Sequence, residues 1–276
     1  MRQTSSILYI AVDAMIPARG SSIPGLDEFT AALDHAGIPA VWVTNRSRLQ
    51  FDDPRRKLGH THPFIAEGGS GVFMPEDYFH LRPAKTVRLG RFTCIPVAEP
   101  LPAAADALEA LSRDTGVAVV TLESLSPREL AQNTGLPQRD AELMRQRDFD
   151  ELFFFAGASQ QDIQRFVAAA PEKNAVLRQH GVLWSIAVGA SLARCVRELA
   201  KLYDRALRYH PTIVGVAAAE DAHDLFRACD RTVLLTSGKA PETAEPAGSG
   251  SHTRQLPLNS RETWDVLLDS LSTRKP

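Results

Sequence analysis

The sequence has no surplus of charge of one sign. Among its 276 residues, 31 Lys and Arg stand against 33 Asp and Glu, which gives a formal net charge of −2. Nucleic-acid-binding proteins commonly carry a basic surplus, so this balance argues against a nucleic-acid partner. Cysteine is also scarce. The chain has only Cys94, Cys195 and Cys229, far apart and odd in number, which excludes a disulfide framework.

Long hydrophobic runs are missing as well. The apolar run at residues 7–12 ends at Asp13, far short of the roughly 18 residues that a membrane span needs. It is also too short and too polar in its surroundings for a secretory signal. We therefore expect a cytoplasmic protein with no membrane partner.

The order of the hydrophobic segments predicts an α/β fold. A buried strand at 7–12 precedes a helix with Leu26, Phe29 and Leu33 at helical spacing, which Gly37 ends, and a second strand stops before Thr44. The alternation returns after residue 190, with a helix at 191–207, strands at 212–217 and 231–235, a loop at 237–258 and a last amphipathic helix. This order indicates βαβ units and a parallel sheet with helices on both faces.

The middle of the chain has a different pattern. It contains strands at 87–95, 117–121 and 151–156, and helices that begin after Ser126 and Ser159, without strict alternation. A mixed order of this kind is typical of an α+β unit. We predict a core domain formed by 1–81 and 189–276, interrupted by an inserted α+β domain at 82–188.

Polar residues gather where the predicted parallel strands end, which is where ligands bind in open α/β sheets. They are Asp13, Thr44, Arg46, Glu220, Asp221 and Asp224, with Arg194 in the first turn of the helix at 191–207. Hydroxyl, cation and carboxylate groups together suit a phosphate, with or without a divalent ion. The same residue types also serve as ordinary helix caps and surface ion pairs.

Three phrases resemble mannosyl-3-phosphoglycerate phosphatases of the haloacid dehalogenase (HAD) superfamily. They are KLGHTHPFIAEGGSGVFMPEDYF (57–79), AELMRQRDFDELFFF (141–155) and LAKLYDRALRYHPTIVGVAAAEDAHDLFRACD (199–230). The resemblance spans nearly the whole chain. It implies a Rossmann-like HAD core with an inserted α+β cap, as the element order also suggests.

The resemblance also implies a mechanism. The family uses an Asp nucleophile directly after the first strand and a second Asp two residues later as acid and base. A Ser or Thr and a helix-start Lys hold the phosphoryl group, and Mg²⁺ is bound by the nucleophile and a late acidic motif. On this chain the implied metal positions are Asp13, Glu220, Asp221 and Asp224. The cap phrase implies ligand contacts from Arg147 and Glu151.

The catalytic positions depart from the family pattern. Ala11 occupies the nucleophile position, while Asp13 is retained at the acid/base position. Glu220 and His223 replace an Asp and an Asn of the late motif, Gly68 replaces an Asn, and Arg194 aligns with the helix-start Lys. If Asp13 is instead taken as the nucleophile, the second position becomes Met15. Either register therefore lacks one aspartate, and without a nucleophile the covalent route is lost.

We therefore predict a phosphatase-like protein with absent or much reduced hydrolysis. It would bind a phosphorylated glycosyl-glycerate or related sugar phosphate between core and cap, with Mg²⁺ bound weakly or lost. Thr44, Arg46 and Arg194 would contact the phosphate, since arginine offers a forked donor set. The alternatives are an active Mg²⁺-dependent phosphatase that uses Asp13, and a purely structural subunit. The sequence leaves the oligomeric state open.

Overall fold

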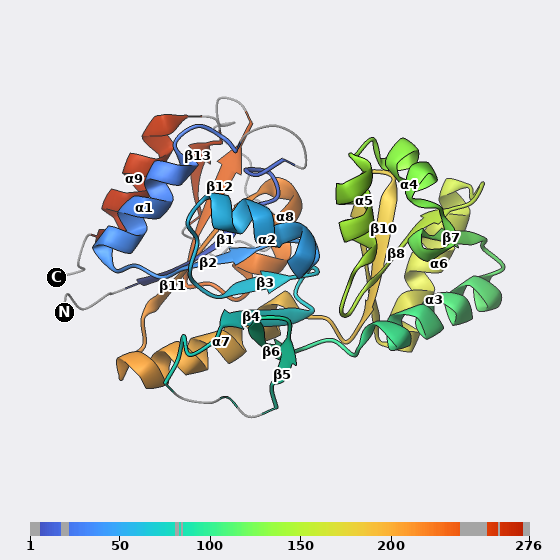
Figure 1. Ribbon diagram of the computed structural model, residues 1–276, viewed down its shortest axis with the longest axis horizontal. Helices are drawn as coiled ribbons and strands as arrows, with labels where there is room; N and C mark the ends of the chain where they lie inside the picture. The colour runs from blue at the N-terminus through green and yellow to red at the C-terminus, as the bar shows by residue number, and fades with distance from the viewer. Residues whose placement is uncertain are drawn as a thin grey trace.

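The computed structural model describes residues 6–17, 22–80, 83, 85–237, 253–258 and 260–272. Two β-sheets, each with its own helices, form two bodies joined side by side (Figure 1). The larger body contains both ends of the described chain, and the smaller body is formed by its middle. None of the helices in these ranges is both long enough and apolar enough to cross a membrane.

The larger sheet has the strand order β13-β12-β11-β1-β2-β3-β4-β6-β5. Its strands from β13 to β3 are parallel, whereas β4, β6 and β5 pair antiparallel. In chain order they are β1 (Ser6–Ala11), β2 (Ala40–Val43), β3 (Phe64–Ala66), β4 (Gly71–Pro75), β5 (Val87–Leu89), β6 (Phe92–Pro96), β11 (Thr212–Ala218), β12 (Arg231–Thr236) and β13 (Thr253–Pro257).

Helices cover both faces of this sheet, so its central strand β1 is buried throughout. Leu8 and Ile10 point toward α1 (Leu26–Ala36), α2 (Arg48–Lys57) and α9 (Arg261–Ser272). The alternate residues Ile7 and Tyr9 point toward α7 (Leu192–Leu207) and α8 (Ala219–Phe226). A strand buried on both faces requires a continuous apolar run, which is the pattern that the sequence shows.

The smaller sheet is antiparallel, with the order β7-β8-β10-β9. Helices α3 and α6 cover one face, and α4 and α5 lie against the other. Capping boxes at Ser126 and Ser159 begin α4 and α6, the two helices that the sequence predicts after these serines. The elements are α3 (Leu101–Thr115), β7 (Val119–Thr121), η1 (Leu122–Ser124), α4 (Pro127–Thr134), α5 (Gln138–Arg145), β8 (Glu151–Phe155), α6 (Gln160–Ala169), η2 (Ala170–Lys173), β9 (Ala175–His180) and β10 (Leu183–Val188).

The expected strand at 87–95 was wrong in two respects. It is a hairpin of β5 and β6 that turns at Gly90, whose φ of 61° suits glycine. The hairpin pairs with β4 in the larger sheet, where Phe92 and Cys94 are buried in the core. We therefore propose that the inserted cap begins after Pro96, later than the expected boundary at residue 82, and ends near residue 189.

The expected loop at 237–258 also needs correction. Its last part forms β13, which pairs in parallel with β12. The two threonines Thr232 and Thr253 share a hydrogen bond of 2.8 Å across this pair. An edge strand buries little apolar surface, so its hydrophobic pattern is weak, and the Gly- and Pro-rich residues before it concealed it. The rest of the expected loop, 238–252, lies outside the described residues.

Candidate functional site

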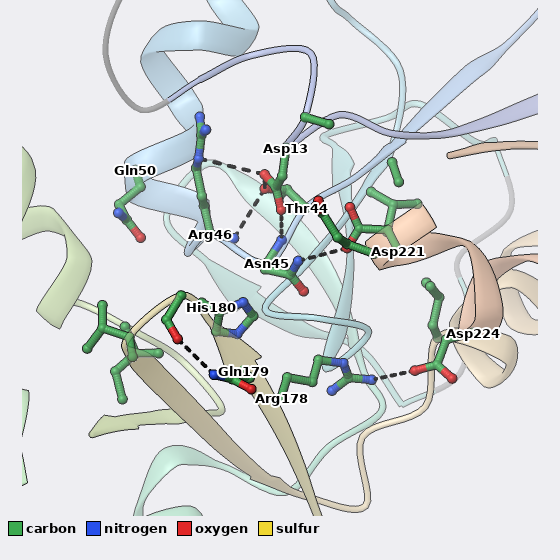
Figure 2. A pocket seen from close by; sticks show the side chains of 18 of the residues that line it. Asp13, Thr44, Asn45, Arg46, Gln50, Arg178, Gln179, His180, Asp221 and Asp224 are labelled. Atoms are coloured by element: carbon green, nitrogen blue, oxygen red, sulfur yellow. Dashed lines mark hydrogen bonds and ion pairs between the residues drawn. The ribbon is translucent and has the colours of Figure 1, made fainter. Parts of the chain in front are cut away.

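A cleft of about 790 Å³ lies between the carboxyl ends of the parallel strands and the smaller sheet. Core residues line one side and residues of the β9–β10 hairpin line the other (Figure 2). Of the nine residues to which the sequence assigned a catalytic, ligand-binding or metal-binding role, seven line this cleft: Asp13, Thr44, Arg46, Arg147, Glu220, Asp221 and Asp224. Arg194 and Glu151 are not among its lining residues.

Ala11 is one of the residues that line the cleft. It is the last residue of β1, pairs with Val43 of β2 and is 2% exposed. This is the place that the resemblance assigns to a nucleophilic carboxylate. A methyl group can neither attack phosphorus nor bind a metal ion.

Asp13 lies in the turn after β1, where protein donors surround its carboxylate. Its Oδ1 accepts a hydrogen bond of 2.5 Å from Thr44 Oγ1, and its Oδ2 accepts one of 2.6 Å from the backbone N–H of Asn45. The Nε of Arg46 lies 3.7 Å from Oδ1. The arrangement fixes Asp13 and offsets its charge. It also means that the Thr44 hydroxyl donates to Asp13.

Asn45 is a residue that the sequence reasoning missed. Besides its bond to Asp13, its side-chain Nδ2 donates to Asp221 at 3.1 Å and its carbonyl accepts from Arg147 at 2.7 Å. Asn45 thereby ties the two strand ends to α8 and to the cap segment. The polar stretch after β2 was the available signal, but its contacts depend on the tertiary fold.

Three acidic residues of α8 also line the core side of the cleft: Glu220, Asp221 and Asp224. Burial and the nearby charge of Asp13 raise the pKa of Asp221 to about 6. Asp224 faces Arg178, with 3.4 Å between its Oδ2 and Nη2 of the arginine, and lies 3.2 Å from His223 Nδ1. Each of these two carboxylates therefore has a protein partner.

These residues do not fit a Mg²⁺ ion in the observed arrangement. Ala11 supplies no oxygen ligand, and the Asp13 and Asp221 oxygens accept bonds from Thr44 and Asn45. Within the described ranges, no group of three or more His, Cys, Asp or Glu side chains is placed to hold a metal ion. The expected set of Asp13, Glu220, Asp221 and Asp224 lines one cleft without converging.

Arg147 is a structural link between cap and core, in addition to lining the cleft. It is 9% exposed and pairs with Asp150 through Nε and Nη2. Its Nη2 also donates to the Asn45 carbonyl and its Nη1 lies 3.4 Å from Gln50. All three guanidinium nitrogens therefore have protein partners, and the expected ligand contact from Arg147 stays a prediction.

Glu67 supports the same link. It is 1% exposed and accepts hydrogen bonds of 2.8–3.2 Å from the backbone N–H groups of Asp148, Phe149 and Asp150. Burial, together with the charge of Asp150, raises the pKa of Glu67 to about 8. The cap phrase that the resemblance singled out is thus anchored in the core.

Glu151 lines a smaller neighbouring pocket of about 250 Å³, close to Glu123 and Arg145. Burial and the charge of Asp150 raise its pKa to about 7. Arg194 is exposed in the first turn of α7, where its backbone N–H donates to Ser191 Oγ at 3.2 Å. Leu192, two residues earlier, lines the cleft instead.

Arg178 of β9 is a cleft cation that the sequence reasoning missed. It shares a strand with His180, which also lines the cleft. Two polar residues two positions apart lie on one face of a strand. That spacing was a usable signal, although it does not say which surface the face meets.

Comparison with solved structures identifies the class of fold. A HAD subclass IIB sugar phosphatase is similar over 96% of this chain and 98% of its own, with a TM-score of 0.63 and 11% identity. A HAD-superfamily phosphatase from Bacteroides thetaiotaomicron is similar over 98% and 96%, with a TM-score of 0.63 and 15% identity. The protein has the α/β Rossmann-like fold of the HAD superfamily, with an inserted cap.

Curated relatives indicate which family within this fold the chain resembles. The glucosyl-3-phosphoglycerate/mannosyl-3-phosphoglycerate phosphatase of Persephonella marina is 26% identical over 220 residues, covering 78% of this chain and 77% of the relative. The protein of the same name from Methanococcoides burtonii is 25% identical over 205 residues, covering 73% and 71%. No protein-family model matches the chain. The resemblance to the mannosyl-3-phosphoglycerate phosphatase family of the HAD superfamily, inferred from the three phrases, is confirmed.

Proposed function

We propose that this phosphatase-like protein binds a phosphorylated glycosyl-glycerate, or a related sugar phosphate, between core and cap, with absent or much reduced hydrolysis. The observation that carries the proposal is Ala11 at the end of β1, lining the cleft where the resemblance places the nucleophile. Covalent catalysis through an aspartyl-phosphate has no attacking group there.

The alternative register, with Asp13 as nucleophile, has little support from the geometry. It would place the acid/base at Met15, which is fully buried in the hydrophobic core. A thioether there can neither protonate a leaving alkoxide nor activate water. Asp13 therefore occupies the acid/base position, and the nucleophile with which it would work is absent because residue 11 is Ala.

Recognition of a ligand is favoured by what remains in the cleft. Its size suits a small ligand, and polar groups of core and cap face it from both sides. Arg46 lies beside Thr44 at the end of β2, and the backbone N–H of Arg46 donates to the Thr44 hydroxyl at 3.1 Å. A phosphoryl group beside Ala11 would meet no carboxylate at residue 11, and the guanidinium group of Arg46 offsets the charge of Asp13 there.

A thermal-shift titration tests the proposal. Mannosyl-3-phosphoglycerate at 100 times its Kd should stabilise the fold by about 2.7 kcal/mol, which is roughly 5–11 °C for a protein of this size. Mannosylglycerate should stabilise it much less, because the charge-assisted bonds to phosphate are absent. If neither compound raises the melting temperature, ligand binding in this cleft is refuted.

A further inference from the structure

We propose that Arg178, which the cap places in the core side of the cleft, is the cation that holds the ligand's anionic group, and that Gly68 makes room for it. The proposal rests on ligand binding in the cleft, as proposed above, and goes further by naming the residue responsible. It also assigns to the cap a task that the resemblance assigns to the start of a core helix.

The start of α7 supplies no cation to the cleft. Leu192 lines the cleft there, while Arg194 is exposed and is not among the lining residues. Of the other arginines that line the cleft, Arg147 has all its guanidinium nitrogens bonded within the protein. Arg46 is engaged by the carbonyl of Ile16 and lies close to Asp13.

Arg178 reaches from β9 of the cap to the core. Its side chain points toward Asp224 of α8 (Figure 2). The side chain is 18% exposed, and its Nη2 lies 3.4 Å from Asp224 Oδ2. A single bond of this length satisfies one of the five guanidinium N–H groups. Arg178 is therefore a largely desolvated cation whose remaining donors are available to a ligand.

Gly68 explains how the arginine fits. A Cβ atom built on Gly68 would lie 3.0 Å from Cδ of Arg178 and 3.1 Å from its Nε and Nη1. The guanidinium group thus lies directly against the backbone of Gly68. The resemblance places an Asn at this position, and an Asn side chain would occupy the same space. An Asn at position 68 would therefore exclude the Arg178 side chain from the place where it lies.

Arg178 also has a competitor in the protein itself. Asp224 Oδ2 accepts a hydrogen bond of 3.4 Å from Arg178 Nη2. An incoming phosphate or carboxylate would compete with Asp224 for this arginine. The sign of an Asp224 substitution therefore separates two roles. If Arg178 binds the ligand, removing the Asp224 charge strengthens binding. If the Arg178–Asp224 pair only fastens cap to core, removing either partner acts in the same direction.

The experiment is calorimetric titration without Mg²⁺, with mannosyl-3-phosphoglycerate and mannosylglycerate as the probes. We expect Arg178→Ala to weaken binding of the phosphorylated probe at least tenfold, and Gly68→Asn to weaken it similarly by displacing the arginine. Asn tolerates the positive φ of 61° at this position, so the fold should persist, which melting curves check. Asp224→Asn should tighten binding severalfold. Arg194→Ala is the matched control and should bind like the wild type.

The outcomes distinguish the role of Arg178 from the proposed function on which it rests. Tight binding by the wild type, together with equal affinities of Arg178→Ala and Arg194→Ala, overturns the role of Arg178 and leaves the proposed function intact. Weaker binding by both Arg178→Ala and Asp224→Asn assigns the pair a fastening role and also overturns the proposal. If the wild type binds neither probe, the proposed function fails and the role of Arg178 fails with it.

Discussion

Replacing Arg147 by Ala should destabilise the protein strongly, because it leaves the buried carboxylate of Asp150 without its cation. The side chains of Arg147 and Asp150 are only 3% and 4% exposed, and Glu67 is 1% exposed beside them. Removing one partner of a buried ion pair typically costs about 3–5 kcal/mol, since the remaining charge stays desolvated. For a protein of this size, that corresponds to a fall in melting temperature of roughly 6–20 °C.

Urea unfolding followed by circular dichroism measures this loss. The exposed pair Arg88–Glu76, with side chains 68% and 58% exposed, supplies the control. Arg88→Ala should change the free energy of unfolding by less than about 1 kcal/mol. A double variant that removes both charges, Arg147→Met with Asp150→Leu, should be more stable than Arg147→Ala. A loss for Arg147→Ala no larger than that for Arg88→Ala would refute the role of Arg147 as the buried link between cap and core.

Three further expectations concern stability, pH and metal. Phe149 is 3% exposed and packs near Phe73, so it belongs to the core although it follows the cap helix α5. Phe149→Ala should therefore lower the free energy of unfolding in urea by about 3–5 kcal/mol. A loss below about 1 kcal/mol would contradict this packing. The fold raises the pKa of Glu151 from 4.5 to about 7, which means that the folded state favours the neutral carboxyl group. The stability of the wild type relative to Glu151→Gln should therefore be greatest below pH 4.5 and decrease as the pH rises through 7. Melting curves from pH 4 to 8 measure this, and a flat difference would exclude it. Millimolar Mg²⁺ should shift the melting temperature little, because Ala11 removes a ligand, and a large shift that Asp224→Asn abolishes would show an intact metal site.

Much of the fold was predictable because hydrophobic periodicity and helix caps act locally. The central strand, the first helix with its stop at Gly37 and the helices that begin after Ser126 and Ser159 lie where the sequence indicates them. The hairpin of β5 and β6 was misplaced because a run of apolar residues does not say which sheet it joins. That choice depends on the buried contacts of residues such as Phe92, which form only in the folded chain.

The core side of the candidate site was predictable, whereas on the cap side the sequence indicated Arg147 but missed Arg178. Asp13 and Thr44 meet because parallel strands end at one edge of a sheet, a rule that needs only the order of elements. No such rule places Arg178 over Gly68, 110 residues earlier in the chain, or buries Arg147 against Asn45. Those positions follow from how the cap docks on the core.

Phosphate release from mannosyl-3-phosphoglycerate, measured on protein shown by calorimetry to bind it, tests the central claim most directly. With Ala11 in place of the nucleophile, we expect saturable binding and release far below the roughly 1–10³ per second that is usual for enzymes, with or without Mg²⁺. Release within that range, abolished by Asp13→Asn, would contradict a binding protein without turnover and show that Asp13 supports hydrolysis by another route.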